Sequence, residues 1–155
     1  MRKTSTFLSL SVLAISVLVQ QPHQAMACPV GGCTNANFYG DYALSASSNG
    51  STPNIAVVGV FHADGAGNFT GQQTNIDDST NPVNVVGPLY ICNSTYSIAS
   101  DGTGTMSVNV YTDVACTIGP VATPTIALVL EDGGRAVRTV NTNGSIVITG
   151  TARLQ

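Results

Sequence analysis

The hydrophobic positions along most of the chain alternate with polar ones and do not follow the three-to-four spacing of an amphipathic helix. From residue 38 onward, short runs rich in Val, Ile, Thr and Tyr are separated by Gly-, Asn- and Asp-rich segments. This pattern is typical of short β-strands joined by turns. It predicts strands over residues 38–47, 54–63, 68–76, 83–86, 89–92, 94–99, 105–112, 125–130, 135–140 and 145–154.

Several of the predicted strands join the next through a dipeptide suited to a tight turn, because both central residues of such a turn need a positive φ. These dipeptides are Asp64-Gly65, Asp101-Gly102, Asp132-Gly133 and Asn143-Gly144. Gly87-Pro88 has a different meaning, because proline lacks the amide hydrogen that a central strand needs. It predicts a break or a bulge between the runs 83–86 and 89–92.

Consecutive hairpins form an antiparallel meander, and a meander of about eight strands has two edges that must be protected. Closure into an up-and-down barrel removes both edges, and eight strands are enough to close one. The scarcity of charge supports closure, since no lysine after Lys3 is present to guard an open edge. The sequence therefore predicts an all-β fold, a single antiparallel up-and-down β-barrel. A β-sandwich of two facing sheets is the alternative.

The N-terminal segment has the three-part layout of a secretory signal peptide. Arg2 and Lys3 precede an apolar stretch over residues 7–19, and Ala25-Met26-Ala27 forms a small-x-small cleavage site. The apolar stretch is shorter than the roughly 18 residues that span a bilayer. We therefore expect a signal peptide over residues 1–27, a barrel domain over residues 28–155 and a secreted or periplasmic protein without a membrane span. A lipoprotein anchored at Cys28 is the minor alternative.

Charge narrows the classes of function. Only 8% of the residues are charged, against roughly 25% in an ordinary soluble domain. Without residues 1–27, three arginines face eight acidic residues, a net charge of 3 − 8 = −5. A lysine-free acidic surface is repelled by DNA, RNA and anionic lipid, which excludes a nucleic-acid-binding role.

The four cysteines, Cys28, Cys33, Cys92 and Cys116, all lie after the predicted cleavage site. An even number in an exported chain indicates two disulfides, for which three pairings exist. We expect Cys28–Cys33, which would close the N-terminal Pro-Val-Gly-Gly loop, and Cys92–Cys116, which would link neighbouring strands. A zinc site is the rival interpretation, but the Cys-x4-Cys spacing is loose and no histidine lies near either pair.

Several segments resemble a group of uncharacterised exported bacterial proteins, in order along most of the chain. They are FYGDYALS (38–45), VVGVFHADGAGN (57–68), STYSI (94–98), GTGT (102–105), LEDGGR (130–135) and GSIVITGTAR (144–153). The resemblance implies a small barrel similar in shape to lipocalin-like and allene-oxide-cyclase-like barrels. It implies no reaction, ligand or cofactor. Relatives often carry a cysteine shortly before the GTGT segment, where this chain has Asp101.

The candidate site residues are few. His62 is the one histidine after residue 27, so a two-histidine metal site is excluded and we expect no metal or cofactor. His62 and Asp64 share a strand face and could form a base with its orienting carboxylate, but a solvent-facing histidine is the simpler interpretation. Candidate ligand-binding residues are Tyr42, Tyr96, Tyr111 and Arg138. The tyrosines could instead fill the barrel, and Arg138 could lie inside it or on its surface, since alternation leaves both open.

These observations favour a non-catalytic protein that binds a small apolar ligand or has a surface or matrix role. The shortage of ionisable groups argues against acid–base catalysis. Two alternatives remain at this point. One is a barrel enzyme of the allene-oxide-cyclase type, an isomerase or cyclase whose cavity folds a reactive substrate. The other is a structural module that assembles with itself. An empty interior would favour a carrier or a cyclase, and a barrel filled with side chains would favour the structural module.

Overall fold

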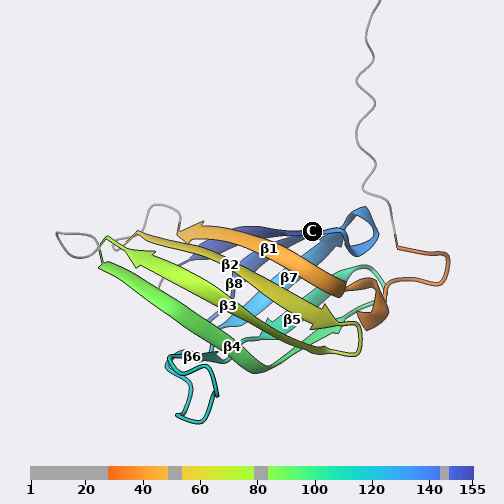
Figure 1. Cartoon of the computed structure of the whole chain (residues 1–155). Helices are drawn as coiled ribbons and strands as arrows, with labels where there is room; N and C mark the ends of the chain where they lie inside the picture. The colour runs from red at the N-terminus through yellow and green to blue at the C-terminus, as the bar shows by residue number, and fades with distance from the viewer. Residues whose placement is uncertain (1–27, 49–53, 79–83, 144–146) are drawn as a thin grey trace, which may run out of the picture.

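A computed structural model describes residues 28–48, 54–78, 84–143 and 147–155. The predicted signal peptide lies outside the described residues, and so do the predicted strand starts at Val83 and Ser145. Nine strands and two short 3-10 turns make up the ordered elements of these ranges (Figure 1). They are η1 (Asn35–Asn37), β1 (Tyr39–Ser48), β2 (Ile55–Asp64), β3 (Asn68–Asp77), β4 (Asn84–Ile98), β5 (Thr103–Ser107), β6 (Val110–Tyr111), β7 (Thr125–Glu131), η2 (Asp132–Gly134), β8 (Ala136–Asn141) and β9 (Ile148–Leu154).

The strands close into an antiparallel barrel. Hydrogen-bonded neighbours follow the order β3-β2-β1-β9-β8-β7-β5-β4, and β4 returns to pair with β3. The first and last strands meet along the β1–β9 pairing, from Tyr42 opposite Leu154 to Ser48 opposite Ile148. Eight strands thus form a closed wall and β6 adds a short extra pairing on β4. The predicted up-and-down barrel is confirmed. The sandwich alternative is wrong, because the eight strands form one closed sheet with no open edges and not two facing sheets.

Two details differ from the expected strand boundaries. The runs 83–86, 89–92 and 94–99 belong to one strand, β4, and Gly87-Pro88 lies where the β3–β4 register shifts, opposite the stretch between Gln73 and Asn75. The dipeptide therefore produces the bulge that was one of the two expectations.

The predicted strand over residues 105–112 is instead divided into β5 and β6. The cause is the neighbouring bend of β4, where Asn93 has a φ of 48°. The buried Ser94 hydroxyl there accepts a hydrogen bond from the Asn109 amide at 2.8 Å. That side-chain bond replaces a regular rung of the β4–β5 ladder, so the strand ends at Ser107 and resumes at Val110.

One half of the barrel is filled by aromatic side chains, and we call it the filled half. Its rings come from the start of β1 and β3, the ends of β2 and β4, and the segment after η1: Phe38, Tyr42, Phe61, Phe69 and Tyr96. Phe38 is fully buried and lies 4.8 Å from the Tyr42 ring and 4.9 Å from the Tyr96 ring, measured between centroids. Because η1 leads directly into Phe38, it closes this end of the barrel.

Both expected disulfides, Cys28–Cys33 and Cys92–Cys116, are present. Cys28–Cys33 closes the N-terminal loop beside η1, and Cys33 is buried in the core of the filled half. Cys92–Cys116 joins β4 to the segment after β6. Two disulfides are compatible with a periplasmic or extracellular protein.

Candidate functional site

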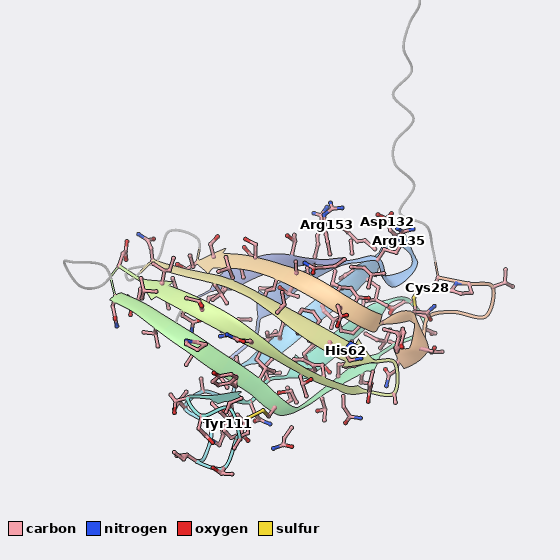
Figure 2. The ribbon with its side chains drawn as sticks, viewed as in Figure 1. Cys28, His62, Tyr111, Asp132, Arg135 and Arg153 are labelled. Carbon is pink, nitrogen blue, oxygen red and sulfur yellow. A yellow bond between two sulfur atoms is a disulfide. The ribbon has the colours of Figure 1, made fainter. Side chains whose placement is uncertain are left out.

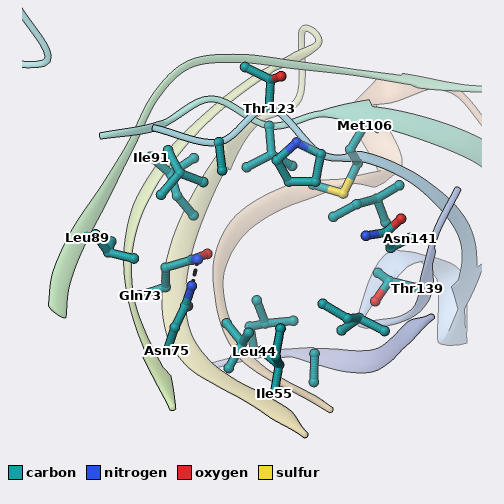
Figure 3. Close-up of a pocket in the computed structure, with 18 of the residues that line it drawn as sticks. Leu44, Ile55, Gln73, Asn75, Leu89, Ile91, Met106, Thr123, Thr139 and Asn141 are labelled. Atoms are coloured by element: carbon teal, nitrogen blue, oxygen red, sulfur yellow. Dashed lines mark hydrogen bonds between the residues drawn. The ribbon is translucent and has the colours of Figure 1, made fainter. Parts of the chain in front are cut away.

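The other half of the barrel is hollow. A cavity of about 730 Å³ occupies it, and we call this region the hollow half (Figure 3). Its wall is built where β1, β3, β5 and β8 end and where β2, β4, β7 and β9 begin. Phe61 and Phe69, two rings of the aromatic core, form its floor. The cavity is therefore a property of one end of the barrel and does not run through it.

Strand alternation explains which side chains reach the cavity, because every second residue of a barrel strand points inward. In β1 these are Leu44 and Ala46, which follow the inward Tyr42 of the filled half. Along the same strand the inward side chains thus shrink from a ring to a methyl group. Opposite Ala46, β9 has Gly150 in the pairing position. Both residues are too short to reach the opposite wall of an eight-stranded barrel, so space remains in its centre.

The residue types on the wall are mostly aliphatic. Leu44, Ile55 and Val57 line the side formed by β1 and β2. The side formed by β4, β5 and β7 is similarly apolar, with Leu89, Ile91, Met106 and Ile126. A molecule that fills the cavity would therefore displace water from two broad apolar surfaces. This burial of apolar surface is the main favourable term in binding.

Polar side chains line two other parts of the wall, which face each other across the cavity. On β3 the inward residues are Gln73, Asn75 and Asp77, and the Gln73 Nε2 donates to the Asn75 Oδ1 at 2.9 Å. On β8 they are Thr139 and Asn141. Four steps around the barrel separate β3 from β8, half of its circumference. Figure 3 shows the two amide groups on opposite sides of the cavity, with Leu44 and Ile55 between them.

A segment after β5 completes the wall where β5 no longer separates β4 from β7. We call residues 108–124 the strap. Its two arms are held to each other by the Val110 amide, which donates to the Ala122 carbonyl at 2.9 Å, and by the Val121 amide, which donates to the Val110 carbonyl at 2.8 Å. One arm pairs with β4 through Val110 and Tyr111. The strap residues that face the cavity are Val108, Val110, Thr112, Val121, Ala122, Thr123 and Pro124.

The tip of the strap has its own fixed turn. The Asp113 carboxylate accepts hydrogen bonds from the amide and the hydroxyl of Thr117 at 2.8 and 3.0 Å. These bonds, the backbone one first, lower the pKa of Asp113. The adjacent Cys116 is bonded to Cys92. The strap is therefore tied to β4 by a covalent bond as well as by its strand pairing.

Tyr42 and Tyr96, two of the candidate ligand-binding residues, belong to the filled half. The Tyr42 hydroxyl donates to the Gly134 carbonyl at 2.5 Å, and the Tyr96 hydroxyl donates to the Phe38 carbonyl at 2.7 Å. Burial raises the pKa of Tyr42 to about 12. Neither side chain lines the cavity. Their hydroxyls join η1 and η2 to the core, which is the filling role that the sequence left open.

The other two candidates also lie away from the cavity. Tyr111 lies in the strap (Figure 2). It is buried, pairs opposite Tyr90 and does not line the cavity. Arg138 points outward from β8, with its side chain 72% exposed and its Nε 2.7 Å from the Glu131 Oε1. Of the two orientations that alternation allowed, the structure has the surface one, with Thr139 facing inward instead.

His62 does not pair with Asp64. Its Nδ1 lies 2.7 Å from the Asp41 Oδ1 on the neighbouring strand β1, and both side chains are largely exposed (Figure 2). Asp64 instead caps the β2–β3 turn, where its carboxylate accepts bonds from the Asn68 side chain and from the amides of residues 66–68. These bonds, the one from the Asn68 side chain first, lower the pKa of Asp64 to about 2. His62 and Asp41 form a surface pair on the filled half.

The polar residues of the cavity were missed in the sequence, although a signal for them exists. In β3 the outward positions, Gln72 and Thr74, are polar, and so are the inward positions, Gln73 and Asn75. A strand of a closed barrel with polar residues on both faces indicates that part of the interior is polar. Asn141 gives a weaker signal, because it is a single amide at the end of its strand.

Within residues 28–48, 54–78, 84–143 and 147–155, no group of three or more His, Cys, Asp or Glu side chains is placed to hold a metal ion. The same ranges contain no helix with the length and hydrophobicity needed to cross a bilayer.

No protein-family model, curated protein or solved structure matches the chain. The resemblance to exported bacterial barrel proteins therefore stays a prediction from the sequence, and the candidate site is argued from its own geometry.

Proposed function

We propose that this protein binds a small, mainly apolar molecule in the hollow half of its barrel and does so without catalysing a reaction. The observation that carries the proposal is the cavity itself. Its volume of about 730 Å³ falls within the range of roughly 300–1,000 Å³ in which proteins hold small ligands. Its wall is largely aliphatic with a few polar groups, which is also typical of such sites.

The chemistry of the wall supports binding over the cyclase alternative. Asp77 is the single ionisable side chain among the described residues that line the cavity. General acid–base catalysis needs a group within hydrogen-bond reach of the reacting atoms, held at a suitable pKa. The amides and hydroxyls of Gln73, Asn75, Thr139 and Asn141 can hold and orient a ligand, but they are poor proton donors and acceptors in a reaction.

The proposed setting is outside the cytoplasm. The predicted signal peptide and the two disulfides both support export. In that setting a largely apolar cavity would carry or sequester an apolar molecule that is poorly soluble by itself.

The proposal is tested by filling the cavity. Ala46→Phe places a ring in the hollow half, whereas Ser45→Phe adds the same ring to the outward face of the same strand. The probe is N-phenyl-1-naphthylamine, an uncharged dye that fluoresces when it leaves water. We expect the unmodified protein and Ser45→Phe to bind it equally, and Ala46→Phe to bind it at least about tenfold more weakly, or about 1.4 kcal/mol.

The folded state of each variant is checked by circular dichroism and by the intact mass with two disulfides. Equal binding by the folded Ala46→Phe and Ser45→Phe variants would contradict a site in the cavity. Absence of binding by the unmodified protein would contradict the proposed function as a whole.

A further inference from the structure

We infer that the ligand is an uncharged amphiphile, with an apolar body and a neutral hydrogen-bonding group such as a hydroxyl, carbonyl or amide. This inference rests on the proposed function and deepens it. It is carried by the two polar parts of the cavity wall, on β3 and β8, and by the absence of a positively charged side chain among the described lining residues.

The β3 side offers a donor and an acceptor next to each other. The hydrogen bond from the Gln73 Nε2 to the Asn75 Oδ1 fixes the two amides relative to each other. It leaves the Gln73 Oε1 as an acceptor and the Asn75 Nδ2 as a donor. A hydroxyl or a primary amide both donates and accepts, so it can satisfy both groups at once. A pure hydrocarbon satisfies neither.

The β8 side adds a second set of groups across the cavity. Within the described part of the chain, no hydrogen bond engages the side chain of Thr139 or of Asn141. Both side chains are half-buried and line the cavity, so their polar atoms face its interior. Polar groups in such a place lose water when a ligand enters and cost free energy if the ligand offers them no partner. A ligand with a neutral polar group avoids part of this cost.

The described side chains on the cavity wall offer no positive charge to an anionic ligand. The described residues that line the cavity include no Lys, Arg or His, and the charged one among them is Asp77. Asp77 follows Gln73 and Asn75 at the outer end of the inward row on β3. A carboxylate brought into this site would lose its hydration without gaining a cationic partner on the described wall. The three arginines after residue 27 are all outside this wall.

The test uses four ligands that share a ten-carbon chain and differ in the head group: 1-decanol, decanamide, decanoate and decylammonium. Each displaces N-phenyl-1-naphthylamine from the protein at pH 7.5, below its solubility limit or micelle concentration. We expect 1-decanol and decanamide to bind at least about tenfold more tightly than decanoate, because the carboxylate loses its hydration without a cationic partner.

Two variants test whether the inward amides of β3 bind the head group. Gln73→Leu removes the inward acceptor and frees the Asn75 amide, and we expect it to weaken decanamide several-fold while leaving the uncharged dye bound as before. Gln72→Leu makes the same change on the outward face of β3, where the side chain is exposed, and we expect no change in any of the four affinities.

The outcomes separate this inference from the proposed function. Decanoate binding as tightly as decanamide would overturn the neutral head group while the dye still binds in the cavity. Decylammonium binding as tightly would overturn it as well, because it would make the Asp77 carboxylate a partner for a cationic head group. Equal effects of Gln73→Leu and Gln72→Leu would overturn the role of the β3 amides. Loss of dye binding by the unmodified protein would instead overturn the proposed function.

Discussion

The two halves of this barrel share the same eight strands and differ mainly in what those strands carry inward. In the filled half, rings from four strands and from the segment after η1 contact one another, and the Tyr42 and Phe61 rings stack at 5.2 Å. In the hollow half, the next inward positions of β1 are Leu44 and Ala46, and a cavity of about 730 Å³ remains. Barrel geometry therefore sets the room available, and side-chain size decides whether that room is filled or left for a ligand.

The two halves are also expected to have different roles, one in the stability of the fold and the other in ligand binding. Phe38 touches three other rings and is fully buried, so the filled half supplies closely packed contacts. The hollow half lacks such contacts across its centre and depends on its wall, on the strap and on the Cys92–Cys116 bond. We expect changes to the filled half to affect folding first and changes to the hollow half to affect ligand binding first.

The largest expected effect comes from truncating one apolar residue in each half. Phe38→Ala leaves a cavity among packed rings and is expected to lower the free energy of unfolding by about 3–5 kcal/mol. Leu44→Ala enlarges a space that already exists, so its expected cost is smaller, about 1–2 kcal/mol. Urea unfolding of both variants measures the difference. Equal costs would contradict the division of the barrel into a filled and a hollow half.

The next effect concerns the strap. Replacing Cys92 and Cys116 together by serine removes a cross-link between residues 24 positions apart. The loop-closure estimate for that separation is a loss of about 3 kcal/mol in the free energy of unfolding. The matched control replaces Cys28 and Cys33, which are 5 positions apart, and is expected to cost about 2 kcal/mol. Because the strap lines the cavity and the loop closed by Cys28–Cys33 does not, dye binding should weaken in the first variant and persist in the second. The reverse order would contradict the role of the strap.

A smaller effect is a dependence on alkaline pH that belongs to the filled half. The pKa of Tyr42 is about 12 in the folded protein, while in the unfolded chain it is close to 10. Between these values the unfolded state loses its proton and the folded state keeps it, so the free energy of unfolding falls as the pH rises. The expected fall from pH 10 to pH 12 is on the order of 2 kcal/mol.

Tyr42→Phe tests that assignment. The variant loses the hydrogen bond to the Gly134 carbonyl, which costs about 1 kcal/mol at neutral pH. It should also lose a large part of the fall in stability above pH 10, measured by urea unfolding at each pH. Burial raises the pKa of Tyr96 too, so part of the fall should remain. A variant with the same alkaline slope as the unmodified protein would show that another group causes it.

The sequence was sufficient to predict the barrel. Alternating residues and Gly-containing turns such as Asp64-Gly65 are local signals, and they located nearly all the strands. The division of the strand over residues 105–112 was not predictable, because it depends on the Asn109 amide finding the Ser94 hydroxyl of another strand. The same limit applies to any feature that needs two strands to be aligned.

The site was harder to predict than the fold. Tyr42 and Tyr96 were recognised as inward candidates, but only the assembled barrel shows that they fill one half and do not line the cavity. The orientation of Arg138 depended on strand parity, which fixes two faces without telling which is inside. The cavity results from the sum of side-chain sizes over all eight strands, so no single segment such as Gln73–Asn75 could reveal it.

The most direct test of this account is an amide NMR titration of the ¹⁵N-labelled protein with 1-decanol. The account predicts shifts concentrated on the cavity wall, at Leu44, Gln73, Ile91 and Asn141, with little change at Phe38 in the filled half. Shifts centred on the filled half or on the outward faces of the strands, or no shifts at a saturating concentration, would contradict a ligand site in the hollow half.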